Sequence, residues 1–357
     1  MNSKITSEKI ANPLLVELLK KLTDSFNRMG REFYVIGATA RDIIIRQLIG
    51  TTSGRRTKDL DIAIAIPDWS VFDEIKDVLV ADGFKKSADM RQRFYYCEYE
   101  LDIVPYGVAK DDDNIYWPPE EEIAMSVKGF DEVLSEAITV NIDGEFDIRI
   151  ASLYGLFLLK FNAWLDRNIE TSKDAEDMSF ILSNYFMANL DRNVYTEVYD
   201  WENFDEYIVG GYWLARDLLL LLTKEQITYY KDCIEKELEK DDESRLFNQI
   251  IENCYDLTYE TVKEAWQTIA DVFQKAIEDE KKRLENTVVA PCDTVNGLLE
   301  EYGTAMISSG VTLASLLRRP QLNYDIIASI DCERPKLPKS VAESAWIEIK
   351  YEGYITV

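Results

Sequence analysis

Three aspartates in the chain have the side chains and the spacing to hold a metal ion beside a nucleotide. Asp59 and Asp61 are two residues apart in an apolar, β-branched segment, and Asp102 lies in a second segment of this kind. Residues i and i+2 of a strand point to the same face, so a neighbouring strand can bring Asp102 beside the first two. Converging carboxylates repel one another and attract a hard divalent cation, Mg²⁺ or Mn²⁺. The pattern therefore predicts a phosphoryl-transfer site with these three metal ligands.

An acidic pair alone is weak evidence, since the chain holds 66 acidic side chains among 357 residues. The residues before the pair strengthen it. A short apolar strand over residues 33–36 leads into Gly37 and then into a predicted helix over residues 38–48. Glycine lets the backbone approach a ligand closely, and the first N–H groups of a helix attract phosphate. This order of elements favours a nucleotide site over a plain strand–helix turn.

Residues 36–42, followed by residues 57–61, resemble the nucleotidyltransferase superfamily and, within it, the poly(A) polymerase and CCA-adding group. The superfamily pattern is Gly-Gly or Gly-Ser, then Asp-x-Asp, then a third acidic residue on a later strand. The chain departs from that pattern in two places. Ala38 replaces the second Gly or Ser, and the interval between Gly37 and the Asp-x-Asp pair is long. A basic loop at residues 51–56 lies within this interval. The resemblance implies a nucleotide-binding set, which is Gly37, Ala38, Thr39, Arg41 and Lys58.

Residues 151–182 resemble the AbiEii-type nucleotidyltransferases, toxins of the type IV toxin–antitoxin systems, and the likeness extends over roughly residues 10–270. In that family a helix lysine and a Lys/Arg-Asp-x-x-Asp segment complete the active site. Lys160 matches the lysine, and Asp174 and Asp177 match the acidic pair. The resemblance implies that Lys160 is catalytic, that Asp177 belongs to the nucleotide site and that an antitoxin partner can exist. Two alternatives stay open: a lysine that reaches solvent, and aspartates that cap a helix.

Composition limits the chemistry further. The chain has no histidine, which excludes imidazole acid–base catalysis, Ser-His-Asp triads and histidine-bound metals, none of which a nucleotidyltransferase needs. Five scattered cysteines without Cys-x-x-Cys spacing favour reduced thiols and no zinc site. We expect a cytoplasmic protein with no membrane partner, because neither a signal-peptide core nor a membrane-length apolar run is found. A net charge of −26 argues against a broad nucleic-acid-binding face.

The carboxy-terminal part has another charge density. Residues 281–357 hold 9 basic and 10 acidic side chains, against 31 and 56 in residues 1–280. A long amphipathic helix is predicted over residues 263–280. Beyond it, about residues 283–355 resemble the C-terminal domain of MnmG (GidA), a flavoenzyme that modifies the wobble uridine of certain tRNAs. No Gly-x-Gly-x-x-Gly segment is present, so we expect no flavin. The segment is either a tRNA-docking module or a purely structural one.

The sequence therefore predicts an α/β nucleotidyltransferase core, a mixed sheet with flanking helices, at residues 1–150. A mostly helical domain that completes the active site follows at residues 151–280, and a small MnmG-like helical module at residues 281–357. The predicted reaction moves a nucleoside monophosphate from an NTP to an acceptor hydroxyl, on a tRNA 3′ end or a protein side chain, with a toxin role implied by the AbiEii resemblance. Two alternatives remain: a catalytically degenerate nucleotide-binding protein, suggested by Ala38, and an acidic interaction protein that docks on a basic partner.

Overall fold

The chain divides into two compact units, each described here by itself. The computed structural model describes residues 2–7, 10, 12–50, 58–107, 113–118, 124–190, 198–202, 204–254, 256–335 and 339–351. The first unit comprises Met1–Gly210 and Arg245–Val262, and the second comprises Gly211–Ser244 and Lys263–Val357. The sheet shares its unit with the helices that follow residue 150, whereas the predicted three-part division separates them. The basic loop predicted at residues 51–56 lies outside the described ranges.

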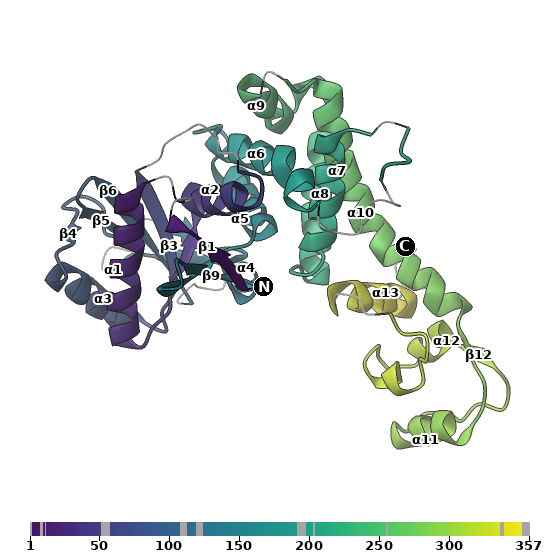
Figure 1. The fold of residues 1–357 in the computed structure, drawn as a ribbon. Coiled ribbons are helices and arrows are strands. Elements are labelled where there is room, and N and C mark those ends of the chain that lie inside the picture. Colours follow the sequence, from purple (N-terminus) through teal and green to yellow (C-terminus); the bar gives the residue numbers. More distant parts are fainter. Residues whose placement is uncertain are drawn as a thin grey trace. The chain divides into compact units, whose positions relative to one another are not determined.

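Within the described residues, the first unit contains a mixed sheet of eight strands in the order β1-β9-β10-β2-β3-β6-β5-β4. Figure 1 shows several of these strands with helices beside them. β3 and β6 are parallel neighbours, β2 runs antiparallel to β3, and β5 runs antiparallel to β6. The predicted mixed sheet with helices around it is confirmed, and the two aspartate-bearing segments are adjacent strands within it. The strands are β1 (Asn2–Ile5), β2 (Tyr34–Ile36), β3 (Asp59–Ala65), β4 (Lys85–Lys86), β5 (Arg93–Tyr96), β6 (Tyr99–Tyr106), β9 (Ile138–Ile142) and β10 (Phe146–Ile150).

The helices of the first unit begin and end at residues suited to those places. The Asn12 side chain accepts the Leu14 N–H at the start of α1, and Gly30 ends that helix in the left-handed conformation. The Ser152 hydroxyl accepts the Gly155 N–H at the start of α5, where the sequence predicts a helix. The elements are α1 (Pro13–Met29), α2 (Gly37–Leu48), α3 (Trp69–Ala81), α4 (Phe130–Ser135), α5 (Leu153–Arg167), α6 (Lys173–Ala188) and α9 (Arg245–Asn253), with the short strands β7 (Asn114–Tyr116) and β8 (Ala124–Ser126).

Two helices contribute to both units: α7 (Glu206–Leu218) and α10 (Tyr259–Asn286). The predicted amphipathic helix over residues 263–280 is confirmed as the central part of α10, with Ile269 and Phe273 on its buried side. The second unit adds α8 (Lys224–Glu239), the 3-10 turn η2 (Asp241–Glu243), β11 (Val288–Val289), α11 (Asp293–Glu301), β12 (Val311–Thr312), α12 (Leu313–Leu317), the 3-10 turn η3 (Ile326–Ser329) and α13 (Lys339–Tyr351).

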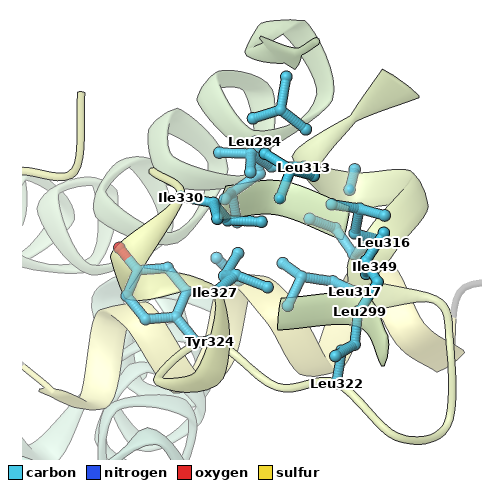
Figure 2. Close-up of a cluster of buried hydrophobic side chains, with 14 of the residues drawn as sticks. Leu284, Leu299, Leu313, Leu316, Leu317, Leu322, Tyr324, Ile327, Ile330 and Ile349 are labelled. Carbon is cyan, nitrogen blue, oxygen red and sulfur yellow. The ribbon is translucent and has the colours of Figure 1, made fainter. Parts of the chain in front are cut away.

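The carboxy-terminal segment has an apolar core of its own, drawn in Figure 2. Leu284 near the end of α10, Leu317 of α12 and Ile349 of α13 are among its members. Arg283 ties the same end of α10 to the segment after η3, because its guanidinium pairs with Glu280 and Asp331, each at 2.7 Å. The end of α10 is therefore an integral part of this small module. Among all described residues, no helix is long and apolar enough to cross a membrane.

Candidate active site

Two carboxylates lie side by side on the parallel strands β3 and β6. Asp61 is the register partner of Asp102, and Asp59 is the partner of Glu100. Residues in register on neighbouring strands share a face of the sheet, so the four carboxylates form a two-by-two array on one face. The sequence-based prediction brought three of them together and missed Glu100. The sequence does contain a pattern that indicates Glu100, because Glu100 and Asp102 have the same i, i+2 spacing as Asp59 and Asp61.

The turn between β2 and α2 lies directly against Asp61. Gly37 has φ = +69°, in the left-handed region that favours glycine. A Cβ atom built on Gly37 would overlap Oδ2 of Asp61 and lie 3.1 Å from its Cγ. Ile36, the residue before the turn, is also the register partner of Asp61. The absence of a side chain at Gly37 therefore makes the room that the Asp61 carboxylate occupies.

Asp61 carries the electrostatic strain of the array. Its pKa is raised from 3.8 to about 6, and burial of the carboxylate is the largest cause. The negative charges of Asp102 and Asp59 add to this rise, while the positive charges of Lys160 and Arg93 oppose it. No hydrogen bond or ion pair to this carboxylate occurs within the described ranges. A buried carboxylate with two anionic neighbours and no directly bonded cation among the described residues is one that a bound cation would stabilise.

Arg93 binds the other carboxylate of the central pair. It is the antiparallel register partner of Asp102, and its Nε and Nη2 donate to the two oxygens of that carboxylate at 2.8 and 2.7 Å. The remaining guanidinium nitrogen, Nη1, pairs with Glu100 at 2.6 Å. This two-pronged contact is the strongest geometry available to an arginine–carboxylate pair. The sequence-based prediction did not assign Arg93 a role at the site.

Lys160 of α5 lies close enough to Asp61 to influence its ionisation. Its ammonium group is 2.7 Å from Asp177 and 3.2 Å from Asp174, both on α6. Burial lowers the pKa of Lys160, but the attraction of Asp177 and Asp174 outweighs it, and the net pKa is raised. Asp174 is fully buried and also accepts two hydrogen bonds from Arg167, at 2.8 and 2.9 Å. Lys160 is therefore a fixed cation at the array.

Arg41 is a second buried cation, on α2. Its side chain is 4% exposed and pairs with Asp177 and with Asp42, the latter at 2.8 Å. The guanidinium also stacks over the Phe180 ring at 4.7 Å. Asp177 thus serves Arg41 and Lys160 together. Arg41 and Lys160 lie on α2 and α5, two helices that pack together. Asp177, which the sequence-based prediction placed in the nucleotide site, joins the two cations.

The remaining predicted nucleotide residues occupy the start of α2 and the edge of β3. Thr39 uses its hydroxyl to donate to the main-chain oxygen of Asp59 at 2.8 Å, which fixes α2 against β3. Ala38 lies in the first turn of α2, whose N-cap has no side-chain hydrogen bond. Lys58 is 59% exposed and pairs with Glu98. The first turn of α2 therefore presents main-chain N–H groups near the array.

The donor chemistry fits a hard divalent cation. Carboxylate oxygens on one face, one of them with a raised pKa caused first by burial and then by its anionic neighbours, match the ligands that Mg²⁺ and Mn²⁺ prefer. In the described part of the chain, however, no three acidic or thiol side chains converge closely enough to hold an ion as they stand. Arg93 already donates to both oxygens of the Asp102 carboxylate.

Comparison with known proteins identifies the carboxy-terminal module. Residues 263–356 match the family described as "tRNA modifying enzyme MnmG/GidA C-terminal helical domain". A tRNA uridine 5-carboxymethylaminomethyl modification enzyme MnmG from Caldicellulosiruptor saccharolyticus is 56% identical over 82 residues, and one from Listeria innocua is 44% identical over 82 residues. Each match covers 23% of this chain and only 13% of the relative. The predicted MnmG-like module is confirmed, and the family match begins about twenty residues before the predicted start, within α10.

Solved structures give weaker likenesses to the chain. A crystal structure of ANT(2'')-Ia in complex with adenylyl-2''-tobramycin matches with a TM-score of 0.31 and 15% identity, over 46% of this chain and 86% of that one. JHP933 from Helicobacter pylori matches with a TM-score of 0.33 and 12% identity, over 75% and 93%. Scores this low do not establish a shared fold, so the case for chemistry in the first unit depends on the site itself.

Proposed function

We propose that the first unit is a metal-dependent nucleotidyltransferase, which moves a nucleoside monophosphate from an NTP to an acceptor hydroxyl and releases pyrophosphate. The observation that carries this proposal is the pairing of Asp61 with Asp102 on adjacent parallel strands, beneath the glycine turn that leads into α2. A carboxylate pair next to a tight turn and a helix N-terminus suits a phosphorylated substrate with its cation. The resemblance of residues 36–61 to nucleotidyltransferases agrees with this.

Each residue then has a chemical task. Asp59, Asp61 and Asp102 would hold Mg²⁺ or Mn²⁺, which when bound would neutralise the charge of the triphosphate. The main-chain N–H groups of the first α2 turn would bind phosphate oxygens. Asp102 would accept the proton of the acceptor hydroxyl. The hydroxyl oxygen would then bond to the α-phosphorus as the bond from that phosphorus to pyrophosphate breaks. Lys160, held by Asp177, would offset the negative charge that builds on the departing pyrophosphate.

The acceptor class is suggested by the other end of the chain. Residues 263–356 match a domain found in a tRNA-modifying enzyme, so we propose tRNA as the acceptor, with a protein side chain as the second choice. A toxin role with an antitoxin partner rests on the AbiEii resemblance alone and remains a proposal.

The decisive test is an incubation of the full chain with each α-labelled NTP, Mg²⁺ or Mn²⁺, total tRNA and cell extract. The double variant Asp59→Asn/Asp61→Asn is the inactive comparison. Asp73→Asn is the matched control, since Asp73 is an exposed aspartate of α3 that pairs with Lys76 away from the array. Label in tRNA with the wild type and the control, but not the double variant, supports the proposal. If only protein is labelled, the proposed nucleotidyl transfer is supported, but the proposal that tRNA is the acceptor is wrong.

Two observations favour a second function, nucleotide binding without turnover. Arg93 occupies both oxygens of Asp102, and Ala38 stands where related enzymes have Gly or Ser. A protein of this kind would bind NTP with a measurable affinity and transfer no label to any acceptor with either metal.

A further inference from the structure

Arg93 is the one cation whose guanidinium forks onto the carboxylate array in the described chain. All three of its guanidinium nitrogens have carboxylate partners: two on Asp102 and one on Glu100. Its side chain is nevertheless 23% exposed, and that of Asp102 is 21% exposed. The pair is therefore reachable by a ligand that approaches this face of the sheet.

The fork limits what Asp102 can bind. Side-on contact with an arginine uses one lone pair on each carboxylate oxygen. A divalent cation on the same carboxylate would also lie beside a fixed positive charge, which disfavours it. Asp102 is therefore a weak metal ligand while Arg93 holds it, although the neighbouring Asp61 lacks any such partner among the described residues.

A phosphate group can take the place of Asp102 on Arg93. Phosphate and carboxylate offer an arginine the same planar, two-oxygen contact, so the guanidinium can change partners and keep its hydrogen bonds. When Arg93 moves to a phosphate, Asp102 regains both oxygens for a cation. The charges balance, because Arg93 exchanges one anion for another and Asp102 exchanges the guanidinium for the divalent cation.

We propose that Arg93 is a substrate-binding arginine that exchanges Asp102 for a nucleotide phosphate, so that binding of the nucleotide opens Asp102 to the metal. This inference depends on the proposed function and deepens it, because it assigns to Arg93 both nucleotide affinity and the order of loading. A free divalent cation binds weakly to the resting site, and the nucleotide completes it.

The test separates metal binding from activity. Mn²⁺ binding to the full chain is titrated by electron paramagnetic resonance without nucleotide, and binding of an α,β-methylene NTP analogue is titrated in chelator without metal. Arg93→Gln should bind Mn²⁺ about tenfold more tightly than the wild type and the metal-free analogue about tenfold more weakly, within the usual range of coupling between sites. Arg93→Lys keeps the positive charge but cannot contact two oxygens side-on, so its affinities should lie between those of the wild type and Arg93→Gln. Arg28→Gln, which removes an exposed arginine of α1 paired with Asp82, should match the wild type.

Asp102→Asn tests the same exchange from the other side, should Arg93→Gln fail to fold. It leaves Arg93 without its main partner, so the metal-free analogue should bind more tightly and Mn²⁺ more weakly than in the wild type. Unchanged affinities in both folded variants overturn the inference, even where the wild type transfers label. If the affinities change as stated but no label is transferred, the exchange stands and the proposed reaction fails.

Discussion

Asp177 joins Lys160 to Arg41: one oxygen of its carboxylate lies 2.7 Å from the Lys160 ammonium, and the other accepts from the Arg41 guanidinium. These cations come from α5 and α2, and neither is more than 21% exposed. A carboxylate shared by these two cations fixes both of them relative to α6, the helix that carries Asp177. We infer that Asp177 positions the cations of the site.

The first prediction concerns this shared carboxylate. Asp177→Asn should lower the free energy of unfolding by about 3 kcal/mol, because it leaves the buried Arg41 guanidinium short of an anionic partner. Asp42→Asn is the matched control. It removes the more exposed partner of the same arginine and should cost about 1 kcal/mol. Calorimetry of both variants measures the difference, and equal costs would show that Asp177 has no special role in holding Arg41.

The second prediction concerns the ionisation of Asp61. Burial and neighbouring anions raise its pKa to about 6 from 3.8, so the folded chain binds this proton more tightly than the unfolded chain. Stability therefore falls as the pH rises from about 4 to about 6, and the penalty persists above that range. In chelator at alkaline pH, Asp61→Asn should be more stable than the wild type by roughly 1–3 kcal/mol.

The gain from Asp61→Asn should vanish below about pH 4, where the wild-type carboxyl is neutral in both states. Asp59→Asn is the control, because Asp59 is exposed on the same strand and should change stability little. Thermal unfolding across the pH range gives both curves. A gain that is the same at every pH would mean that packing, and not ionisation, sets the stability at this position.

The third prediction concerns Gly37. Gly37→Ala should cost about 1–3 kcal/mol, because alanine is strained at a positive φ and its Cβ overlaps the Asp61 carboxylate. Gly83→Ala is the control for the backbone effect alone, since Gly83 also has a positive φ but no atom within 4 Å of an added Cβ. If the overlap matters, Gly37→Ala should reduce Mn²⁺ binding in the presence of the nucleotide analogue, while Gly83→Ala should not. Equal Mn²⁺ affinities in the two variants would show that Gly37 does not contribute to metal binding at the site.

Much of this architecture follows from local patterns in the sequence. The i, i+2 spacing of Asp59 and Asp61 places both on one face once a strand is recognised, and the apolar run before Lys160 marks α5. The MnmG-like module is recognisable because the order of its residues is distinctive over a long segment.

The partner of Asp102 could not be found in this way. β5 and β6 form a hairpin whose two-residue turn has Cys97 at φ = +51°, where Asn-Gly or Asp-Gly is the usual signal. Without that signal the register is hidden, and the register alone decides that Arg93 faces Asp102. The sequence does not show that Arg41 and Lys160 share Asp177 either, because that contact depends on how α2, α5 and α6 pack.

The last prediction separates the carboxy-terminal module from the chemistry. Leu317 is fully buried in the core of that module, so Leu317→Ala should destabilise it by about 2–5 kcal/mol. Leu220→Ala is the matched control in the same unit, because Leu220 is 62% exposed. Hydrogen exchange of residues 284–349 should rise only in the Leu317 variant, whereas peptides from β3 and β6 should keep their protection. If the module brings tRNA to the site, this variant should lose label in tRNA and still bind the NTP analogue with wild-type affinity. Unchanged tRNA labelling in a variant whose module has lost its protection would mean that the acceptor is recognised elsewhere.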